Sequence, residues 1–314
     1  MKPAQHQHLW GIDLGGTKIE GVVLESPTTP NVLARHRLPT GSQFGYAHVL
    51  GQIGQVMEKL GKEVGYRPST VGMGTPGILD PATRLMKNCN STCLNGKPLR
   101  HDLEEKLGMG FVLANDANCF ALAETQMGIV RERFKGAKVV FGVIMGTGVG
   151  GGIVVNGAII NGLHGIGGEW GHNFLDASGG PCYCGKEGCV ETVLSGPALE
   201  KYYHALTGQK KGLPEIYKAH QAGLDRNATV TINRLTYFFG KAISTVVNIL
   251  DPDVIVVGGG VGNIEALYTE GIASLKDHVF NDYLEVKVVK PKLGDSAGVF
   301  GAAFLTVGNF PLSH

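Results

Sequence analysis

Three cysteines and one histidine lie close together near the middle of the chain. His172 is followed by Cys182, Cys184 and Cys189, with glycines among them that permit tight turns. Thiolate sulfur and imidazole nitrogen are usual ligands of tetrahedral Zn²⁺, and four protein ligands leave no open position for a reacting water. The spacing therefore predicts a structural zinc site held by these four residues, with a disulfide as the alternative use of the cysteines.

Two glutamates flank this group. Glu169 precedes His172 by three positions, and Glu191 follows Cys189 by two. A carboxylate accepts strong hydrogen bonds from sugar hydroxyls, whereas a phosphate pocket avoids carboxylates. We expect both glutamates to face a sugar pocket beside the zinc loop. For either one alone, a solvated surface charge is the simpler interpretation.

Two glycine-rich turns each follow an apolar, β-rich segment. Backbone N–H groups in such turns can hold a phosphate, and the carboxylate of Asp13 suits Mg²⁺. Strand-like residues continue after the first turn, which argues against the helix-opening loops that bind nucleotides in other folds. The turns predict a polyphosphate site, with ordinary hairpin turns as the alternative. The candidate residues are Asp13, Gly15, Gly16, Thr17, Lys18, Gly146, Thr147 and Gly148.

A polar cluster, Asn115-Asp116-Ala117-Asn118, stands at an expected junction between a strand and a helix. Ligand groups in α/β folds commonly lie at such junctions. Phosphoryl transfer needs a carboxylate that accepts the proton of the attacking hydroxyl, and Asp116 is the candidate. A role limited to capping the helix is the alternative for Asp116.

The elements that position these residues follow from hydrophobic periodicity and glycine punctuation. The pattern predicts alternating strands and helices, and hence an α/β fold in which a glycine-rich hairpin occurs twice. The expected hairpins cover residues 9–25 and 137–157. The expected strands cover 70–73, 110–114 and 253–257, and the expected helices cover 47–64, 116–127, 231–250 and 299–307.

Composition narrows the class of protein. The chain has 314 residues, 48 of them glycine, 43% hydrophobic residues and a formal net charge of +1. This length favours two lobes, and the balanced charge gives no reason to expect a nucleic-acid or membrane partner. No signal peptide or spanning segment is visible near the N-terminus, so we expect a cytoplasmic protein. The remaining cysteines, Cys89, Cys93 and Cys119, lack metal-ligand spacing and are expected to be ordinary thiols.

Together these motifs resemble the ROK family of sugar kinases and sugar-responsive repressors, within the actin-like ATPase superfamily. The resemblance spans nearly the whole chain and is carried by seven motifs. They are IDLGGTK (12–18), GMGTPG (72–77), LANDAN (113–118), GTGVGGG (146–152), GEWGH (168–172), CYCGKEGCVE (182–191) and DPDVIVVGGG (251–260).

The resemblance implies a two-lobed actin-like (ribonuclease H-like) fold around a central cleft. The small lobe would contain residues 1–117 and 297–314, and the large lobe residues 118–296. The resemblance also implies ATP, Mg²⁺ and structural Zn²⁺ as cofactors and a homodimer as the assembly. Asp116 would be the catalytic base, and Gly259 and Gly260 would approach the adenosine. The implied sugar contacts are Asn90, Asn115, Asp116, Glu169, His172 and Glu191.

Residues 87–99 and the GEWGHN segment resemble the fructokinase branch, so D-fructose is the expected acceptor. Cys93 departs from that branch, where an aromatic residue is expected. Mannose or glucose is a possible further substrate, and N-acetylglucosamine kinase or glucokinase is the alternative within the family. A ROK-type repressor is the non-enzyme alternative, although only twelve residues precede Asp13, too few for a helix-turn-helix module. A nucleic-acid zinc knuckle is a weaker alternative, because the cysteines lack a basic, aromatic surround.

Overall fold

The computed structural model describes residues 8–307. They form two compact units: the first contains residues up to Lys135, residues 157–167 and residues from Lys292 onward, and the second contains residues 136–156 and 168–291. Residues 118–135, expected in the large lobe, belong to the first unit. The reason is that helix α3 (Asp116–Gln126) packs against helix α10 (Ala297–Phe304).

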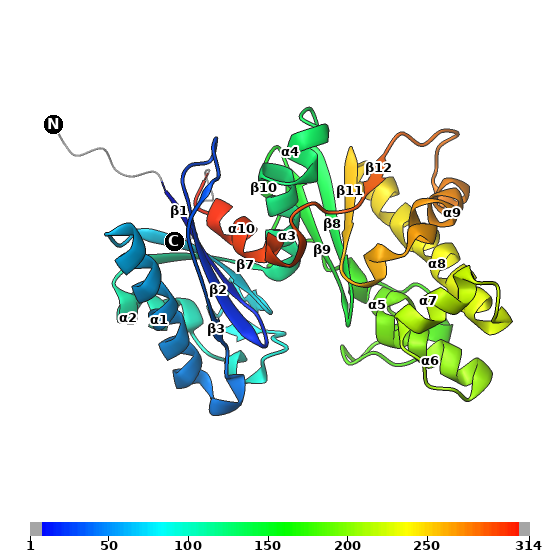
Figure 1. The fold of residues 1–314 in the computed structure, drawn as a ribbon, viewed down its shortest axis with the longest axis horizontal. Coiled ribbons are helices and arrows are strands. Elements are labelled where there is room, and N and C mark those ends of the chain that lie inside the picture. Colours follow the sequence, from blue (N-terminus) through cyan, green and yellow to red (C-terminus); the bar gives the residue numbers. More distant parts are fainter. Residues whose placement is uncertain (1–7, 308–314) are drawn as a thin grey trace. The chain divides into compact units, whose positions relative to one another are not determined.

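The first unit is built on a five-stranded sheet with the order β3-β2-β1-β4-β7 (Figure 1). The first three strands in sequence are antiparallel, whereas β4 and β7 run parallel to β1. The strands are β1 (Leu9–Leu14), β2 (Lys18–Leu24), β3 (Val32–Pro39), β4 (Thr70–Thr75) and β7 (Gly110–Asn115). Smaller elements complete this unit: β5 (Ile78–Leu79), β6 (Met86–Lys87), α2 (Leu99–Leu107), α4 (Ile129–Arg133) and β10 (Ala158–Ile159).

Helices cover both faces of this sheet. Helix α1 (Tyr46–Val64) packs on one face, where a Cβ on Gly21 would overlap Val56. Helix α10 packs on the other face, where a Cβ on Gly72 would lie 1.7 Å from the carbonyl oxygen of Ala302. The missing Cβ therefore allows the backbones of sheet and helix to touch.

The second unit repeats this plan. A hairpin of β8 (Val139–Met145) and β9 (Val149–Val155) is followed by β11 (Val254–Gly258) and β12 (Lys287–Val289), which lie parallel to β8 in the order β9-β8-β11-β12. Its helices are α5 (Val190–Leu194), α6 (Gly196–Thr207), α7 (Leu213–Gln221), α8 (Arg226–Leu250) and α9 (Glu270–His278). Helix α8 packs against α6, α7 and α9 and contributes much of the core.

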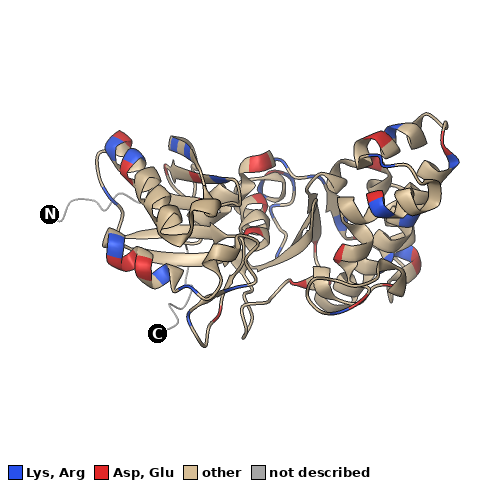
Figure 2. Cartoon of the chain, turned by 90° about the horizontal axis from the view of Figure 1, so that it is seen from below, with Lys and Arg blue, Asp and Glu red and all other residues tan. Residues whose placement is uncertain are grey.

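The expected elements are all present, with shifted ends. Helix α8 begins at Arg226 instead of residue 231, because Asp225 caps it by accepting hydrogen bonds from the N–H groups of Asn227 and Ala228. Within residues 8–307, no helix is long and apolar enough to cross a membrane. Figure 2 shows basic and acidic residues interspersed along the chain, in agreement with its small net charge.

Candidate functional site

Three parallel strands of the first unit bring its candidate residues to one edge of the sheet. β1 ends just after Asp13, β4 ends at Thr75, and β7 ends at Asn115. Because parallel strands present their carboxyl ends at the same edge, Asp13 and Asp116 lie near each other although 103 positions separate them (116 minus 13).

Asp13 sits in a tightly packed position. A Cβ on Gly298 would lie 2.8 Å from one carboxylate oxygen, and a Cβ on Gly74 would lie 3.2 Å from the other. Burial raises the pKa of Asp13 to about 7, and the negative charges of Asp116 and Glu20 add to the rise. The carboxylate is therefore held in a site where a cation would relieve its desolvation and the repulsion from its neighbours.

Asp116 is the first residue of α3, but it is not the cap. The side-chain oxygen of Asn115 caps this helix by accepting a hydrogen bond from Asn118 N–H at 2.8 Å. The interpretation of Asp116 as the capping residue was therefore wrong. Asp116 is exposed and accepts a hydrogen bond from Ala117 N–H at 2.8 Å. Although its surface is exposed, many neighbouring protein atoms displace water around the carboxylate, and this desolvation raises the pKa of Asp116. The hydrogen bond from Ala117 N–H acts against the rise.

Cys119, which we expected to be an ordinary thiol, lies beside these carboxylates. Its sulfur would be 3.3 Å from a Cβ on Gly74. Burial and the charges of Asp13 and Asp116 raise the pKa of Cys119 well above its usual value. The side chain is thus a neutral packing group at the base of the site, and only the i, i+3 spacing from Asp116 hints at this in the sequence.

The first glycine turn forms the expected hairpin between β1 and β2. Gly15 N–H donates to the carbonyl of Lys18 at 3.0 Å, and the Thr40 hydroxyl donates to the carbonyl of Gly15 at 2.7 Å. Gly16 and Thr17 are exposed at its tip. Lys18 lies 3.5 Å from the fully buried Glu20, which also pairs with Arg35 and Arg37 of β3.

The segment containing Asn90 lies near this turn. Ser91 Oγ would be 4.0 Å from a Cβ on Gly16, and Asn90 N–H donates to the carbonyl of Pro76 at 3.4 Å. Asn95 closes the loop by pairing with both backbone groups of Cys89. The Asn90 side chain is exposed, and the structure thus brings Asn90, Asp13 and Asp116 to one region of the first unit.

In the second unit, the turn after β8 and the end of β11 lie side by side. Gly259 has a φ of +80°, and a Cβ there would lie 2.2 Å from the carbonyl oxygen of Met145. Gly260 N is 4.0 Å from the Cβ position of Gly146. Only a residue without a Cβ allows this close approach at position 259, which explains the glycine at the end of β11.

These residues border a cavity of about 710 Å³, a size typical of small-molecule sites. Gly146, Thr147 and Gly260 are among its lining residues. The helices α6 and α7 contribute further lining residues that the sequence reading missed, including Glu200, Leu213 and Tyr217. No motif marks these three, because they belong to amphipathic helices whose pattern also suits an ordinary surface.

The histidine and three cysteines come together as expected. One ligand atom from each of His172, Cys182, Cys184 and Cys189 lies within 4.8 Å of the others. His172 Nδ1 is 3.6 Å from Cys182 Sγ, and Cys184 Sγ is 3.6 Å from Cys189 Sγ. Sulfurs arranged tetrahedrally at about 2.3 Å from Zn²⁺ would be about 3.8 Å apart, whereas a disulfide needs about 2.05 Å. The cysteines are free thiols and their spacing fits a metal.

The remaining ring nitrogen of His172 faces the other way. Nε2 lies 3.1 Å from the hydroxyl of Tyr183, while Nδ1 faces Cys182. One histidine can therefore serve a metal through one nitrogen and a polar partner through the other.

Glu191 lies in α5, directly after Cys189, and reaches the second glycine turn. Its carboxylate accepts a hydrogen bond from Val149 N–H at 2.9 Å, and a Cβ on Gly148 would be 2.6 Å from it. Glu169 precedes the short helix Trp170–His172, which packs on β9 where a Cβ on Gly171 would lie 2.0 Å from the carbonyl oxygen of Val149. Both glutamates are partly buried rather than solvated surface charges.

The predicted residues thus fall into two groups, each brought together within one unit. The first unit holds Asn90, Asn115, Asp116, Asp13, Gly15, Gly16, Thr17 and Lys18; the second holds Gly146, Thr147, Gly148, Glu169, His172, Cys182, Cys184, Cys189, Glu191, Gly259 and Gly260.

Comparison with known proteins supports the family resemblance. The model of the ROK family matches residues 9–308. An N-acetyl-D-glucosamine kinase of Aliivibrio fischeri is 35% identical in an alignment of length 308 that covers 95% of this chain and 99% of the relative.

Two solved structures show the same fold. A ROK hexokinase from Thermus thermophilus has a TM-score of 0.85 at 31% identity, covering 95% of this chain and 97% of its own. A ROK family glucokinase from Streptomyces griseus, in complex with glucose and AMPPNP, has a TM-score of 0.73 at 26% identity, covering 95% and 98%. The predicted α/β, actin-like fold class is confirmed.

Proposed function

This chain belongs to the ROK family of sugar kinases, and on that premise we propose that it transfers the γ-phosphate of ATP to the 6-hydroxyl of a hexose. The observation that carries this proposal is the placement of Asp116. It is an exposed carboxylate at the carboxyl end of a parallel strand, near Asp13 and the glycine turn. The glucokinase from Streptomyces griseus, whose structure contains glucose and AMPPNP, supports the choice of a sugar and ATP.

In the proposed reaction, Asp116 accepts the proton of the attacking hydroxyl. Its raised pKa keeps this carboxylate a better proton acceptor than a solvated aspartate. Asn115 would contribute its amide nitrogen to the sugar, because its side-chain oxygen already caps α3. Asn90, Glu169, His172 through Nε2, and Glu191 are the other proposed sugar contacts.

Backbone N–H groups of the two glycine turns, with Thr17, Lys18 and Thr147, are proposed to bind the phosphates. Asp13 has the chemistry to hold Mg²⁺, which would neutralise charge on the transferring phosphate. Gly259 and Gly260 would allow the nucleoside to approach the backbone, and the cavity beside them would receive it.

Zn²⁺ is the metal that best fits His172, Cys182, Cys184 and Cys189. With four protein ligands it would have a structural role. It would fix the start of α5, and so the position of Glu191.

N-acetyl-D-glucosamine is the acceptor that the relatives favour. Relatives at 34–35% identity, from Aliivibrio fischeri and Aliivibrio salmonicida, are N-acetyl-D-glucosamine kinases, and the two solved structures described above are a hexokinase and a glucokinase. We therefore place N-acetyl-D-glucosamine ahead of D-fructose, the acceptor first expected from the sequence.

D-fructose is the second candidate because of one particular segment. Residues 87–99 carry the resemblance to fructokinases, and in the structure the part around Asn90 lies near the first glycine turn. A loop in that position is suited to distinguish one hexose from another.

A coupled assay of ADP release tests these proposals. N-acetyl-D-glucosamine, fructose, mannose and glucose are each supplied with MgATP, and kcat/KM is compared. A preference for one of the first two decides between the candidate acceptors. If the protein binds sugar but releases ADP with none of the four, the kinase proposal is overturned and a non-catalytic, repressor-like protein is favoured.

A further inference from the structure

A single acidic side chain lines the nucleotide-sized cavity of the second unit. Among its lining residues only Glu200 is charged; the others include glycines, Thr147, Asn263 and apolar side chains. A carboxylate in a cavity for a polyanionic nucleotide must avoid the phosphates, so its position within the cavity indicates what it contacts.

The helix that carries Glu200 starts at the proposed phosphate end. Gly196, the first residue of α6, donates its N–H to the carbonyl of Gly146 at 2.8 Å, in the second glycine turn. Glu200 lies four residues further along, about 6 Å along the helix axis. This step is comparable with the width of a ribose from its 5′ side to its 2′ and 3′ hydroxyls.

The carboxylate is held in one orientation. One oxygen of Glu200 accepts a hydrogen bond from the backbone N–H of Leu213 at 2.8 Å. An ionised carboxylate has further acceptor positions after one such bond, and Glu200 is only partly buried, at the border of the cavity. Vicinal ribose hydroxyls are two donors that suit such an acceptor, as they do at the acidic residue of dinucleotide-binding folds.

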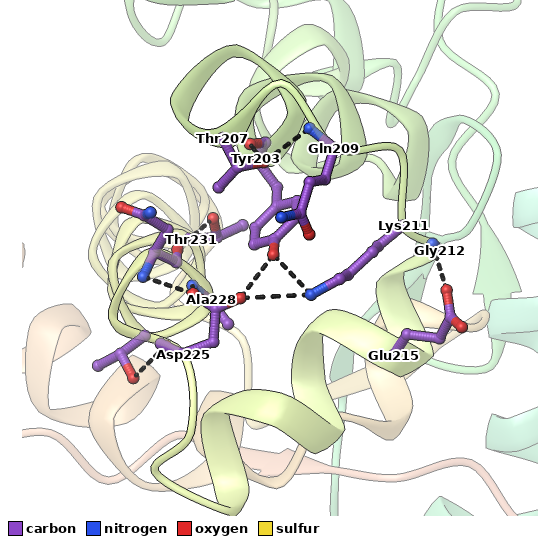
Figure 3. A network of polar contacts seen from close by, with 11 residues as sticks. Tyr203, Thr207, Gln209, Lys211, Gly212, Glu215, Asp225, Ala228 and Thr231 are labelled. Atoms are coloured by element: carbon purple, nitrogen blue, oxygen red, sulfur yellow. Dashed lines mark hydrogen bonds and ion pairs between the residues drawn. The ribbon is translucent and has the colours of Figure 1, made fainter.

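A polar network fixes the connection that supplies Leu213. Figure 3 shows Tyr203, Lys211 and Asp225 pointing toward one another. The Tyr203 hydroxyl donates to Asp225 Oδ2 at 2.5 Å, and Lys211 Nζ donates to the Tyr203 oxygen at 2.9 Å. Tyr203 lies in α6, and Asp225 is the N-cap of α8, so the network ties the connection between α6 and α7 to two helices. Leu213 N–H, and with it the Glu200 carboxylate, is therefore held before a nucleotide binds.

We propose that Glu200 binds the ribose 2′ and 3′ hydroxyls of the nucleotide and makes this kinase selective for ribonucleoside triphosphates. The proposal rests on the assignment of ATP as the phosphate donor. Leu213 and Tyr217 of α7 also line the cavity and would contact the base.

The test compares ATP with 2′-deoxy-ATP and 3′-deoxy-ATP in wild type and in Glu200→Gln. Glutamine keeps an acceptor for Leu213 N–H and removes the charge. We expect the KM for ATP to rise about tenfold in Glu200→Gln, with kcat and the KM for sugar nearly unchanged. The KM for at least one of the deoxynucleotides should change less than twofold, because the contact is already missing.

Glu215→Gln is the matched control. Glu215 is an exposed glutamate in the next helix that accepts a hydrogen bond from Gly212 N–H at 3.2 Å and does not line the cavity. The KM ratio of deoxynucleotide to ATP should remain that of wild type in Glu215→Gln. A second variant, Glu200→Asp, keeps the charge on a shorter side chain and should show an intermediate ratio.

An equal rise in KM for ATP and both deoxynucleotides in Glu200→Gln would overturn the proposal. It would indicate a contact to the base or a purely structural role. If wild type shows no sugar-dependent ADP release at all, the proposed kinase function fails instead. Calorimetric titration with MgATP and the two deoxynucleotides then tests the Glu200 contact by itself, and equal affinities would reject it.

Discussion

Glu191 accepts a hydrogen bond from the backbone N–H of Val149 at 2.9 Å. This bond joins the residue that follows the cysteine cluster by two positions to the strand that leaves the second glycine turn. The proposed sugar-binding and phosphate-binding groups of the second unit are therefore in direct contact, and a change in one alters the other.

Gly148→Ala tests this contact. The added Cβ would lie 2.6 Å from the Glu191 carboxylate, which must then move. We expect the KM for sugar to rise about tenfold or more, with a smaller change in the KM for ATP. The comparison is Gly146→Ala in the same turn, whose Cβ is 4.0 Å from its nearest neighbour, Gly260 N. That variant should mainly raise the KM for ATP; equal effects of both variants on both KM values would contradict the prediction.

Asp116→Asn should lower kcat by a factor of about 10²–10⁴, the usual contribution of a general base. Because Asn115, not Asp116, caps α3, the melting temperature should stay within about 2 °C of wild type. Sugar affinity, measured by calorimetry, should remain. Turnover above one tenth of the wild-type rate would exclude Asp116 as the base.

Removal of zinc should weaken sugar binding. Cys184→Ser deletes one of the four ligands, and the loop that leads into α5 and Glu191 then loses its crosslink. We expect loss of bound zinc by mass spectrometry of the native protein and at least a fivefold rise in the sugar dissociation constant. Glu187→Gln, at an exposed residue of the same loop that is not one of the four ligands, is the control and should change neither quantity.

The raised pKa of Asp13 predicts how stability and ATP affinity depend on pH. Its pKa is about 7 in the folded protein, against an ordinary value of 3.8, so the folded state retains a proton that the unfolded state loses between these pH values. The contribution of Asp13 to stability is therefore fully present below about pH 4 and falls as pH rises to 7. At about 1.4 kcal/mol per pKa unit, the loss is on the order of 2–4 kcal/mol.

Denaturant unfolding of wild type and Asp13→Asn at pH 5, 7 and 8.5 measures this difference. We expect Asp13→Asn to gain stability relative to wild type as pH rises, and wild type to lose MgATP affinity below about pH 7, when Asp13 is protonated. A stability difference that does not change with pH would show that Asp13 ionises normally.

The repeated hairpin-and-strand plan was predictable because glycine turns and apolar β-rich segments are local signals. The positions of the candidate residues follow from one further rule, that parallel strands present their carboxyl ends at the same edge of a sheet. This rule predicts that Asp13 lies near Asp116. The four candidate zinc ligands could also be predicted from the sequence, because they lie close together in it. Their fit to a metal is geometric, and their occupancy remains a prediction.

Other features depend on contacts that sequence patterns do not contain. Asn115 was not identified as the cap, because two adjacent residues, Asn and Asp, are equally suited to that role and only the backbone geometry distinguishes them. Glu200 was missed because its neighbour, Leu213 N–H, is supplied by another helix. The boundary of the first unit was misplaced for a similar reason: α3 packs against α10, which lies about 180 residues later.

The packing of α10 also affects the order in which the protein forms during synthesis. The sheet of the first unit is complete in sequence by Asn115, but one of its faces is covered by residues 297–304, which are synthesised only after the whole second unit. The second unit, by contrast, lies entirely within residues 136–291. The sheet that is synthesised first therefore keeps an uncovered apolar face until residues 297–304 have been made. The second unit has all its residues once Pro291 has been made. A nascent chain that stops before residue 297 should need chaperone protection of its N-terminal sheet.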